Sequence, residues 1–114
     1  MSAAIVLAIS AEHADAILAG TAKFDRRRVP PKHLPARAYL AVVGAAAIVG
    51  ECELGPPGRR SAHGWSLPVR RPRRYRVPRP LAEFGLARTP RSFRYVAGPG
   101  RYVAGPGRAA PASD

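Results

Sequence analysis

Short apolar runs alternate with turn residues in the first part of the chain, which predicts strands around one helix. Residues 4–9 form an apolar run suited to a buried strand. Ser10 follows as a helix N-cap, and apolar residues recur at helical spacing from Ala14 to Leu18. Gly20 then stands where a left-handed residue commonly ends a helix. The pattern predicts a strand, a helix and a stop.

A second strand is predicted at residues 23–29, where a pair of prolines closes the segment. Successive side chains of a strand point to opposite faces of the sheet. We expect Phe24 to face the core. The outward face then carries Lys23, Asp25 and Arg27, directed towards any ligand.

The apolar centre of the fold is predicted at residues 39–43 and 47–54, two antiparallel strands joined at Gly44 and Ala45. A helix over residues 38–49 is the competing interpretation, because alanine is the best helix former. The β-branched residues and the two glycines in this stretch favour strands.

The second half of the chain is rich in proline and glycine, which predicts turns and irregular strands. A loop at residues 56–60 precedes a strand at 65–69. Residues 72–80 combine arginine with proline and are expected to form an edge or an extended crossing. One helical turn at residues 80–84 and a last strand at 92–96 complete the pattern.

A chain of 114 residues with 46% hydrophobic residues has room for one domain with a core. Near its end the heptapeptide RYVAGPG occurs twice in succession, at residues 94–100 and 101–107. We interpret the repeat as a duplication that lengthened a flexible tail, because the unit is too short for a repeat fold. The expected organisation is a domain at residues 1–97 and a Gly/Pro/Ala tail at 98–114.

The net charge of +12 is concentrated in one region of the chain. Residues 1–58 carry six basic and five acidic side chains, whereas residues 59–94 carry eleven arginines and only Glu83. Such a block repels itself unless it meets a polyanion, and arginine donates two parallel hydrogen bonds to phosphates and base edges. The charge therefore favours a nucleic-acid partner. A solvated basic surface in an arginine-rich protein is the alternative.

Cysteine usage and the start of the chain indicate the compartment. The single Cys52 excludes an internal disulfide, and its apolar neighbourhood predicts a buried structural thiol in a reducing environment. The N-terminus lacks the basic segment of a secretory signal, and the longest apolar run, residues 38–50, is too short to span a bilayer. We expect a cytoplasmic protein without a membrane partner.

Three passages within residues 4–96 resemble the ASCH domain, a member of the PUA-like superfamily. They are residues 16–28, residues 47–51, and a set formed by 64–65, 72–75, 80–81 and 92–95. The resemblance implies an α+β fold: a small mixed β-barrel of about five to six strands with one main N-terminal helix and short helical turns. It also implies a role in RNA binding or RNA modification.

The first passage is similar to the family pattern G-x-K-x-x-E-x-R. Gly20 and Arg27 match the pattern, Asp25 replaces the glutamate, and Ala22 stands at the lysine position with Lys23 next to it. Some ASCH-type enzymes remove an acyl group from a modified cytidine with a lysine, a threonine and a glutamate near this segment. At their lysine and threonine positions this chain has Ala22 and Asp25, which argues against that activity. We therefore predict no catalytic residue.

Two clusters are expected to bind nucleic acid. An Asp25–Arg27 ion pair would orient the guanidinium for a base or a phosphate, the alternative being an ordinary surface salt bridge. In the proline-interrupted segment, Tyr75 would stack on a base between phosphate-binding arginines, or else play a structural role. The predicted binding residues are Lys23, Asp25, Arg27, Arg70, Arg71, Arg73, Arg74 and Tyr75.

Other chemistry is weakly indicated by the residues. The three histidines have no metal-ligand spacing, so neither a metal nor another cofactor is expected. Glu51 and Glu53 share one strand face and could act as acid and base, or simply face solvent. The favoured function is RNA binding in a cleft between residues 20–28 and the arginine–proline segment. The alternatives are a hydrolase or nuclease with Glu51 or Asp25 as base, and a DNA-associated regulatory protein.

Overall fold

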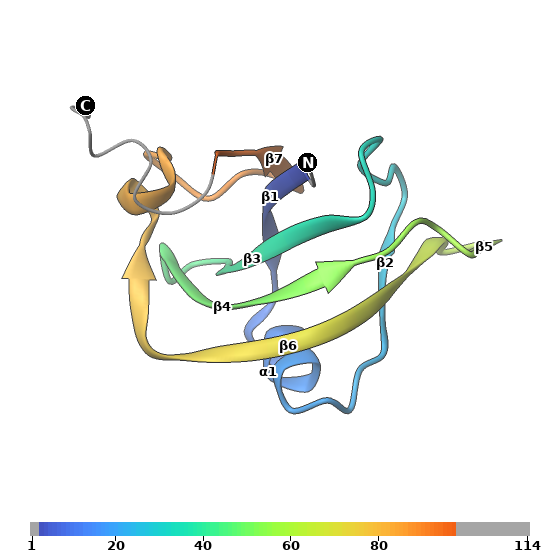
Figure 1. The fold of residues 1–114 in the computed structure, drawn as a ribbon, viewed down its shortest axis with the longest axis horizontal. Coiled ribbons are helices and arrows are strands. Elements are labelled where there is room, and N and C mark those ends of the chain that lie inside the picture. Colours follow the sequence, from blue (N-terminus) through green and yellow to red (C-terminus); the bar gives the residue numbers. More distant parts are fainter. Residues whose placement is uncertain (1–2, 98–114) are drawn as a thin grey trace.

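The computed structural model describes residues 3–97, which form one strongly curled sheet with a single α-helix packed against it (Figure 1). Helix α1 spans Ala11–Leu18, and a short 3₁₀ helix, η1, spans Leu81–Phe84. The strands are β1 (Ala3–Ile9), β2 (Phe24–Arg27), β3 (Ala36–Val42), β4 (Ala47–Leu54), β5 (Arg59–Ser61), β6 (Gly64–Pro80) and β7 (Phe93–Tyr95). The predicted α+β class is confirmed, with more strands than expected. The expected tail at residues 98–114 lies outside the described residues.

The sheet is mixed, as predicted. Its strand order is β2-β6-β4-β3-β1-β7, with β5 paired alongside β6. Strands β1 and β3 are parallel because α1 and β2 lie between them in the chain, and the other pairs are antiparallel. Strands β2 and β7 therefore stand at opposite ends of the strand order.

The structure confirms the predicted start and end of helix α1. The Ser10 hydroxyl accepts the backbone N–H of His13 at 3.2 Å, capping the helix start. Gly20 has a φ of 83° and donates its N–H to the Ile17 carbonyl at 3.0 Å. These two bonds fix the length of α1 and the point from which the chain turns towards β2.

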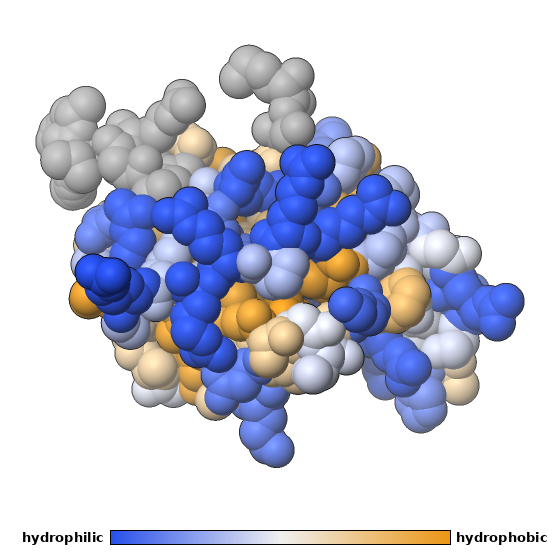
Figure 2. All heavy atoms as spheres, turned by 60° about the horizontal axis from the view of Figure 1, so that its bottom comes forward, coloured by the Kyte–Doolittle hydropathy of each residue, from blue (hydrophilic) through white to orange (hydrophobic). Residues whose placement is uncertain are grey.

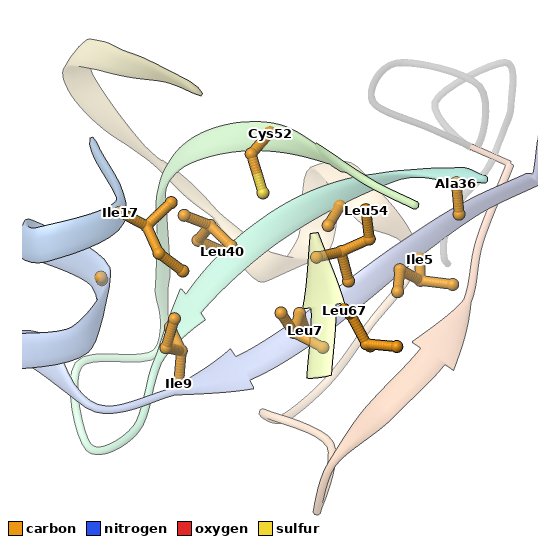
Figure 3. Packing of buried hydrophobic residues seen from close by; sticks show 11 residues of the cluster. Ile5, Leu7, Ile9, Ile17, Ala36, Leu40, Cys52, Leu54 and Leu67 are labelled. Carbon is orange, nitrogen blue, oxygen red and sulfur yellow. The ribbon is translucent and has the colours of Figure 1, made fainter. Parts of the chain in front are cut away.

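Apolar side chains fill both faces of the sheet. Inside the curl, α1 contributes Ile17 to a cluster built from the strands (Figure 3). The other face is covered by η1 and the residues after it, where Phe84 packs on Tyr39 with ring centroids 4.8 Å apart. The larger cluster includes Ile5, Leu7, Ile9, Leu40, Cys52, Leu54 and Leu67.

The 17-residue strand β6 joins two segments, residues 65–69 and 72–80, that were predicted to be separate. Its first residues pair with β2 and β5, and its later residues pair with β4. Neither Pro72 nor Pro78 has a register partner in β4, so the missing N–H groups interrupt no ladder bond there. Strand β5 occupies part of the segment that was predicted to be a loop at residues 56–60.

Candidate functional site

A cavity of about 540 Å³ lies where the end of β1, the start of α1 and strand β2 meet. Its volume falls within the range of small-ligand sites. Three of the predicted binding residues line it, and six others join them. The lining residues are Ala8, Ile9, Ser10, His13, Lys23, Phe24, Asp25, Arg26 and Arg27.

The alternation of side chains along β2 is the reverse of the prediction. Asp25 is buried, with 1% of its surface exposed, and Phe24 is 55% exposed. Strand β2 can turn Asp25 inwards because its charge is neutralised and hydrogen-bonded there. The expectation that Phe24 faces the core is therefore wrong, and Lys23 is exposed whereas Asp25 is not.

The Asp25 carboxylate has two side-chain partners. Arg27 donates from Nε to Oδ2 at 2.7 Å and from Nη2 to Oδ1 at 3.4 Å. His13, on the first turns of α1, places Nε2 3.1 Å from Oδ1. No role for His13 was predicted from the sequence, because the three histidines lack metal-ligand spacing. His13 lies four residues before the buried Ile17, so both side chains lie on the same side of α1. This spacing could have predicted that His13 faces the sheet.

Arg27 also fastens the two ends of the sheet to each other. Its Nη2 donates to the Ala8 carbonyl of β1 at 2.8 Å, and its Nη1 lies 3.3 Å from the hydroxyl and 3.5 Å from the carbonyl of Ser92, next to β7. We call this set of contacts the Arg27 clasp. Because these contacts occupy the donors of one guanidinium, the clasp shapes the wall of the cavity, whereas the side chains of Lys23 and Arg26 are exposed.

The run of arginines in β6 starts next to β2, the strand whose residues line the cavity. Val69 donates its N–H to the Lys23 carbonyl at 2.9 Å, so Arg70 follows directly after the contact with β2. Arg74 then reaches α1, where its Nη2 lies 2.9 Å from Asp15 Oδ1. We call the exposed members of this run the arginine strip; they are Arg70, Arg71, Arg73, Arg74 and Arg76.

Figure 2 shows the face of the molecule that lies at the bottom of Figure 1. On this face strongly hydrophilic side chains surround a hydrophobic area. Helix α1 and the middle of β6 lie on that side. The predicted cleft between residues 20–28 and the arginine–proline segment is placed differently in the structure. Strands β2 and β6 are neighbours in the sheet, and the cavity opens on the β1 and α1 side of β2.

Tyr75 is half-buried among the side chains of the outer sheet face. Its hydroxyl donates to Oε1 of the buried Glu51 at 2.8 Å, and burial together with this bond raises the pKa of Tyr75. Arg37 pairs with the other oxygen of Glu51. The guanidinium groups of Arg73 and Arg79 lie 6.0 and 5.8 Å from the centroid of the Tyr75 ring. These contacts support the structural role for Tyr75 and give Glu51 fixed partners.

Residues 3–97 contain no cluster of three or more side chains able to hold a metal ion. In that same part of the chain no helix is long and apolar enough to cross a membrane. Cys52 is buried, as predicted, and burial beside Asp25, Glu51 and Glu53 raises its thiol pKa to about 12. The thiol is therefore protonated near neutral pH.

The curled mixed sheet with one α-helix has the fold of ASCH-domain crystal structures. The crystal structure of ASCH from Zymomonas mobilis has a TM-score of 0.66 and 15% identity, covering 81% of this chain and 86% of that one. Two mutant forms of the same protein have TM-scores of 0.65, with identities of 15% and 17%. No family model and no curated protein matches the sequence. The likeness establishes the fold, as the sequence resemblance predicted.

Proposed function

We propose that this protein is an RNA-binding module of the cell interior that holds its ligand at the cavity and along the arginine strip. The observation that carries the proposal is the position of the cavity beside two sets of exposed cations. Arg26 lies on β2 and Lys23 directly precedes this strand, and the arginine strip belongs to β6, which pairs with β2. Exposed cations on neighbouring strands suit a phosphate backbone, whose binding releases counterions.

Fluorescence polarisation with a labelled short single-stranded RNA tests this proposal. Binding is expected to weaken steeply as salt rises, with a log–log slope of about −0.7 for each phosphate contact. Unlabelled duplex DNA and structured RNA are then compared as competitors. Preferential displacement by duplex DNA would favour the DNA-associated alternative, and affinity that does not change with salt contradicts the phosphate mechanism.

A hydrolase or nuclease is the second candidate, and the His13–Asp25 contact favours it. A carboxylate bound to one ring nitrogen fixes the orientation of an imidazole, and a histidine so placed at a cavity can act as a general base. Incubation of purified protein with labelled RNA, followed on a denaturing gel, tests for turnover. Cleavage that His13→Gln abolishes while RNA affinity persists supports an enzyme, and uncleaved RNA with the wild-type protein rules this candidate out for that substrate.

A further inference from the structure

Phe24 is a large aromatic side chain held in solvent at the edge of the cavity. It is 55% exposed, although it belongs to a four-residue strand whose next residue, Asp25, is 1% exposed. Four other large hydrophobic residues among those described are comparably exposed: Val29, Val43, Val77 and Tyr95. None of these four lines the cavity, which sets Phe24 apart as an apolar group presented to a ligand.

The neighbours of Phe24 indicate what kind of ligand meets its ring. Lys23 precedes it, and Arg26 follows on the same side of β2; both side chains are exposed and both line the cavity. An aromatic ring between cations is the arrangement that binds single-stranded nucleic acid, in which phosphates contact the cations and an unstacked base lies on the ring. A purely apolar partner surface would leave these two charges without counterions.

The inner wall of the cavity is electrically balanced, in contrast to this rim. The Asp25 carboxylate is paired with the Arg27 guanidinium at 2.7 Å, and both charges are consumed by contacts within the protein. A neutral wall suits an uncharged nucleobase better than a phosphate, which would meet the Asp25 carboxylate. The rim and the wall therefore favour different parts of one nucleotide.

We infer that Phe24 is the stacking residue of the cavity and that the ligand is single-stranded, offering at least one unpaired base. This inference rests on the proposed RNA-binding function and specifies the ligand form. A base inside a duplex has both faces covered by its neighbours, so it has no free face for the ring. Lys23 and Arg26 then hold the phosphates that flank the stacked base.

The test uses Phe24→Ala, Phe24→Tyr and the control Val29→Ala, which removes an exposed apolar side chain outside the cavity lining. Each full-length protein is titrated by fluorescence polarisation against a labelled single-stranded RNA and against an abasic oligomer of the same length and charge. Phe24→Ala is expected to weaken binding of the RNA by about 5- to 150-fold, since one base–aromatic stack contributes about 1–3 kcal/mol. Phe24→Tyr and Val29→Ala are expected to bind RNA like the wild type.

The abasic oligomer separates stacking from other effects. Its affinity is expected to change less than twofold in Phe24→Ala, because it has no base to stack. Equal weakening of both oligomers, or unchanged binding of the RNA, overturns the inference. Tighter binding of duplex than of single-stranded RNA by the wild type also overturns it. Failure of the wild type to bind any of these RNAs refutes the proposed function itself, and thermal melting followed by circular dichroism verifies that each variant is folded.

Discussion

At the scale of single residues, Asp25 connects the candidate site to the stability of the fold. Its carboxylate is buried and paired with Arg27, whose side chain is 14% exposed. A buried ion pair contributes little relative to apolar residues, but removing one partner leaves the other charge buried and uncompensated. We therefore expect the free energy of unfolding to fall strongly when only one partner of the pair is removed.

Asp25→Ala is expected to lower the free energy of unfolding by about 3–5 kcal/mol, because the Arg27 guanidinium keeps its burial and loses its counterion. Urea denaturation followed by circular dichroism measures the change. The matched control is Asp15→Ala, which breaks the exposed ion pair with Arg74. That substitution is expected to cost less than about 1 kcal/mol. Equal losses for the two variants would contradict a special role for the buried pair.

The buried thiol of Cys52 predicts how stability depends on alkaline pH. Burial raises its pKa from 9.0 to about 12, so the folded state retains the proton at pH values where the unfolded state loses it. Ionisation of Cys52 therefore leaves the free energy of unfolding unchanged below pH 9. Above pH 9 it lowers the free energy of unfolding by about 1.4 kcal/mol per pH unit. Unfolding titrations at pH 8, 9 and 10 test this. Cys52→Ala is expected to show a shallower decline, and a slope equal to that of the wild type would disprove the effect.

At the scale of elements, the start of β6 depends on a close approach between two backbones. Gly64 has a φ of 116°, and a Cβ atom there would lie 2.6 Å from the Arg27 carbonyl oxygen. This contact places β6 against the end of β2 and thereby aligns the strand that carries the cavity residues Phe24 and Arg26 with the strand that carries the arginine strip. A side chain at residue 64 has neither the conformation nor the space it needs.

Gly64→Ala is expected to destabilise the fold by about 1–3 kcal/mol through backbone strain, with further loss from the steric contact. For a domain of this size, the melting temperature should fall by at least about 4 °C. Gly58→Ala is the control, since no heavy atom lies within 4 Å of a Cβ built there and its φ is not positive. Differential scanning calorimetry measures both. A melting temperature for Gly64→Ala as high as that of Gly58→Ala would refute the argument.

The elements also show what local sequence signals can predict. The Ser10 cap, the stop at Gly20 and the apolar strands at residues 39–43 and 47–54 depend on near neighbours, and the structure contains each of them. The orientation of β2 depends on partners far away in the sequence, namely Ala8 and Ser92. The pattern of residues 23–29 does not show which face of the strand these partners bury. The prediction from alternation therefore placed Phe24 on the wrong face.

At the scale of the whole molecule, the charge is unevenly distributed in space as well as along the chain. The arginine strip lies on one strand, whereas Arg88, Arg91 and Arg94 belong to the segment that follows η1 and ends in β7. Both groups are exposed. The regional excess of charge could be predicted from the sequence, but the cavity beside it could not, because its lining comes from three elements that only the folded sheet brings together.

Replacement of Arg70, Arg71 and Arg73 by glutamine is expected to reduce the salt slope of RNA binding by about 2, at about 0.7 for each lost phosphate contact. The control replaces Arg88, Arg91 and Arg94 by glutamine and removes the same net charge from the other segment. It should leave the slope nearly unchanged. Fluorescence polarisation at several salt concentrations measures both variants, and equal effects would show that net charge rather than position governs binding.

The Arg27 clasp is a direct link from β2 to β1 and to the segment before β7, and it bounds the cavity. We expect that an open form without the Ala8 and Ser92 contacts has a less ordered cavity wall, although β2 keeps its pairing with β6. A ligand that binds only the closed form must then stabilise it by mass action, by about 2.7 kcal/mol at a free concentration one hundred times the Kd. Amide hydrogen exchange in the segments that the Arg27 clasp joins should therefore slow as the cavity is occupied. Exchange rates there would then measure ligand binding through the local opening of the sheet.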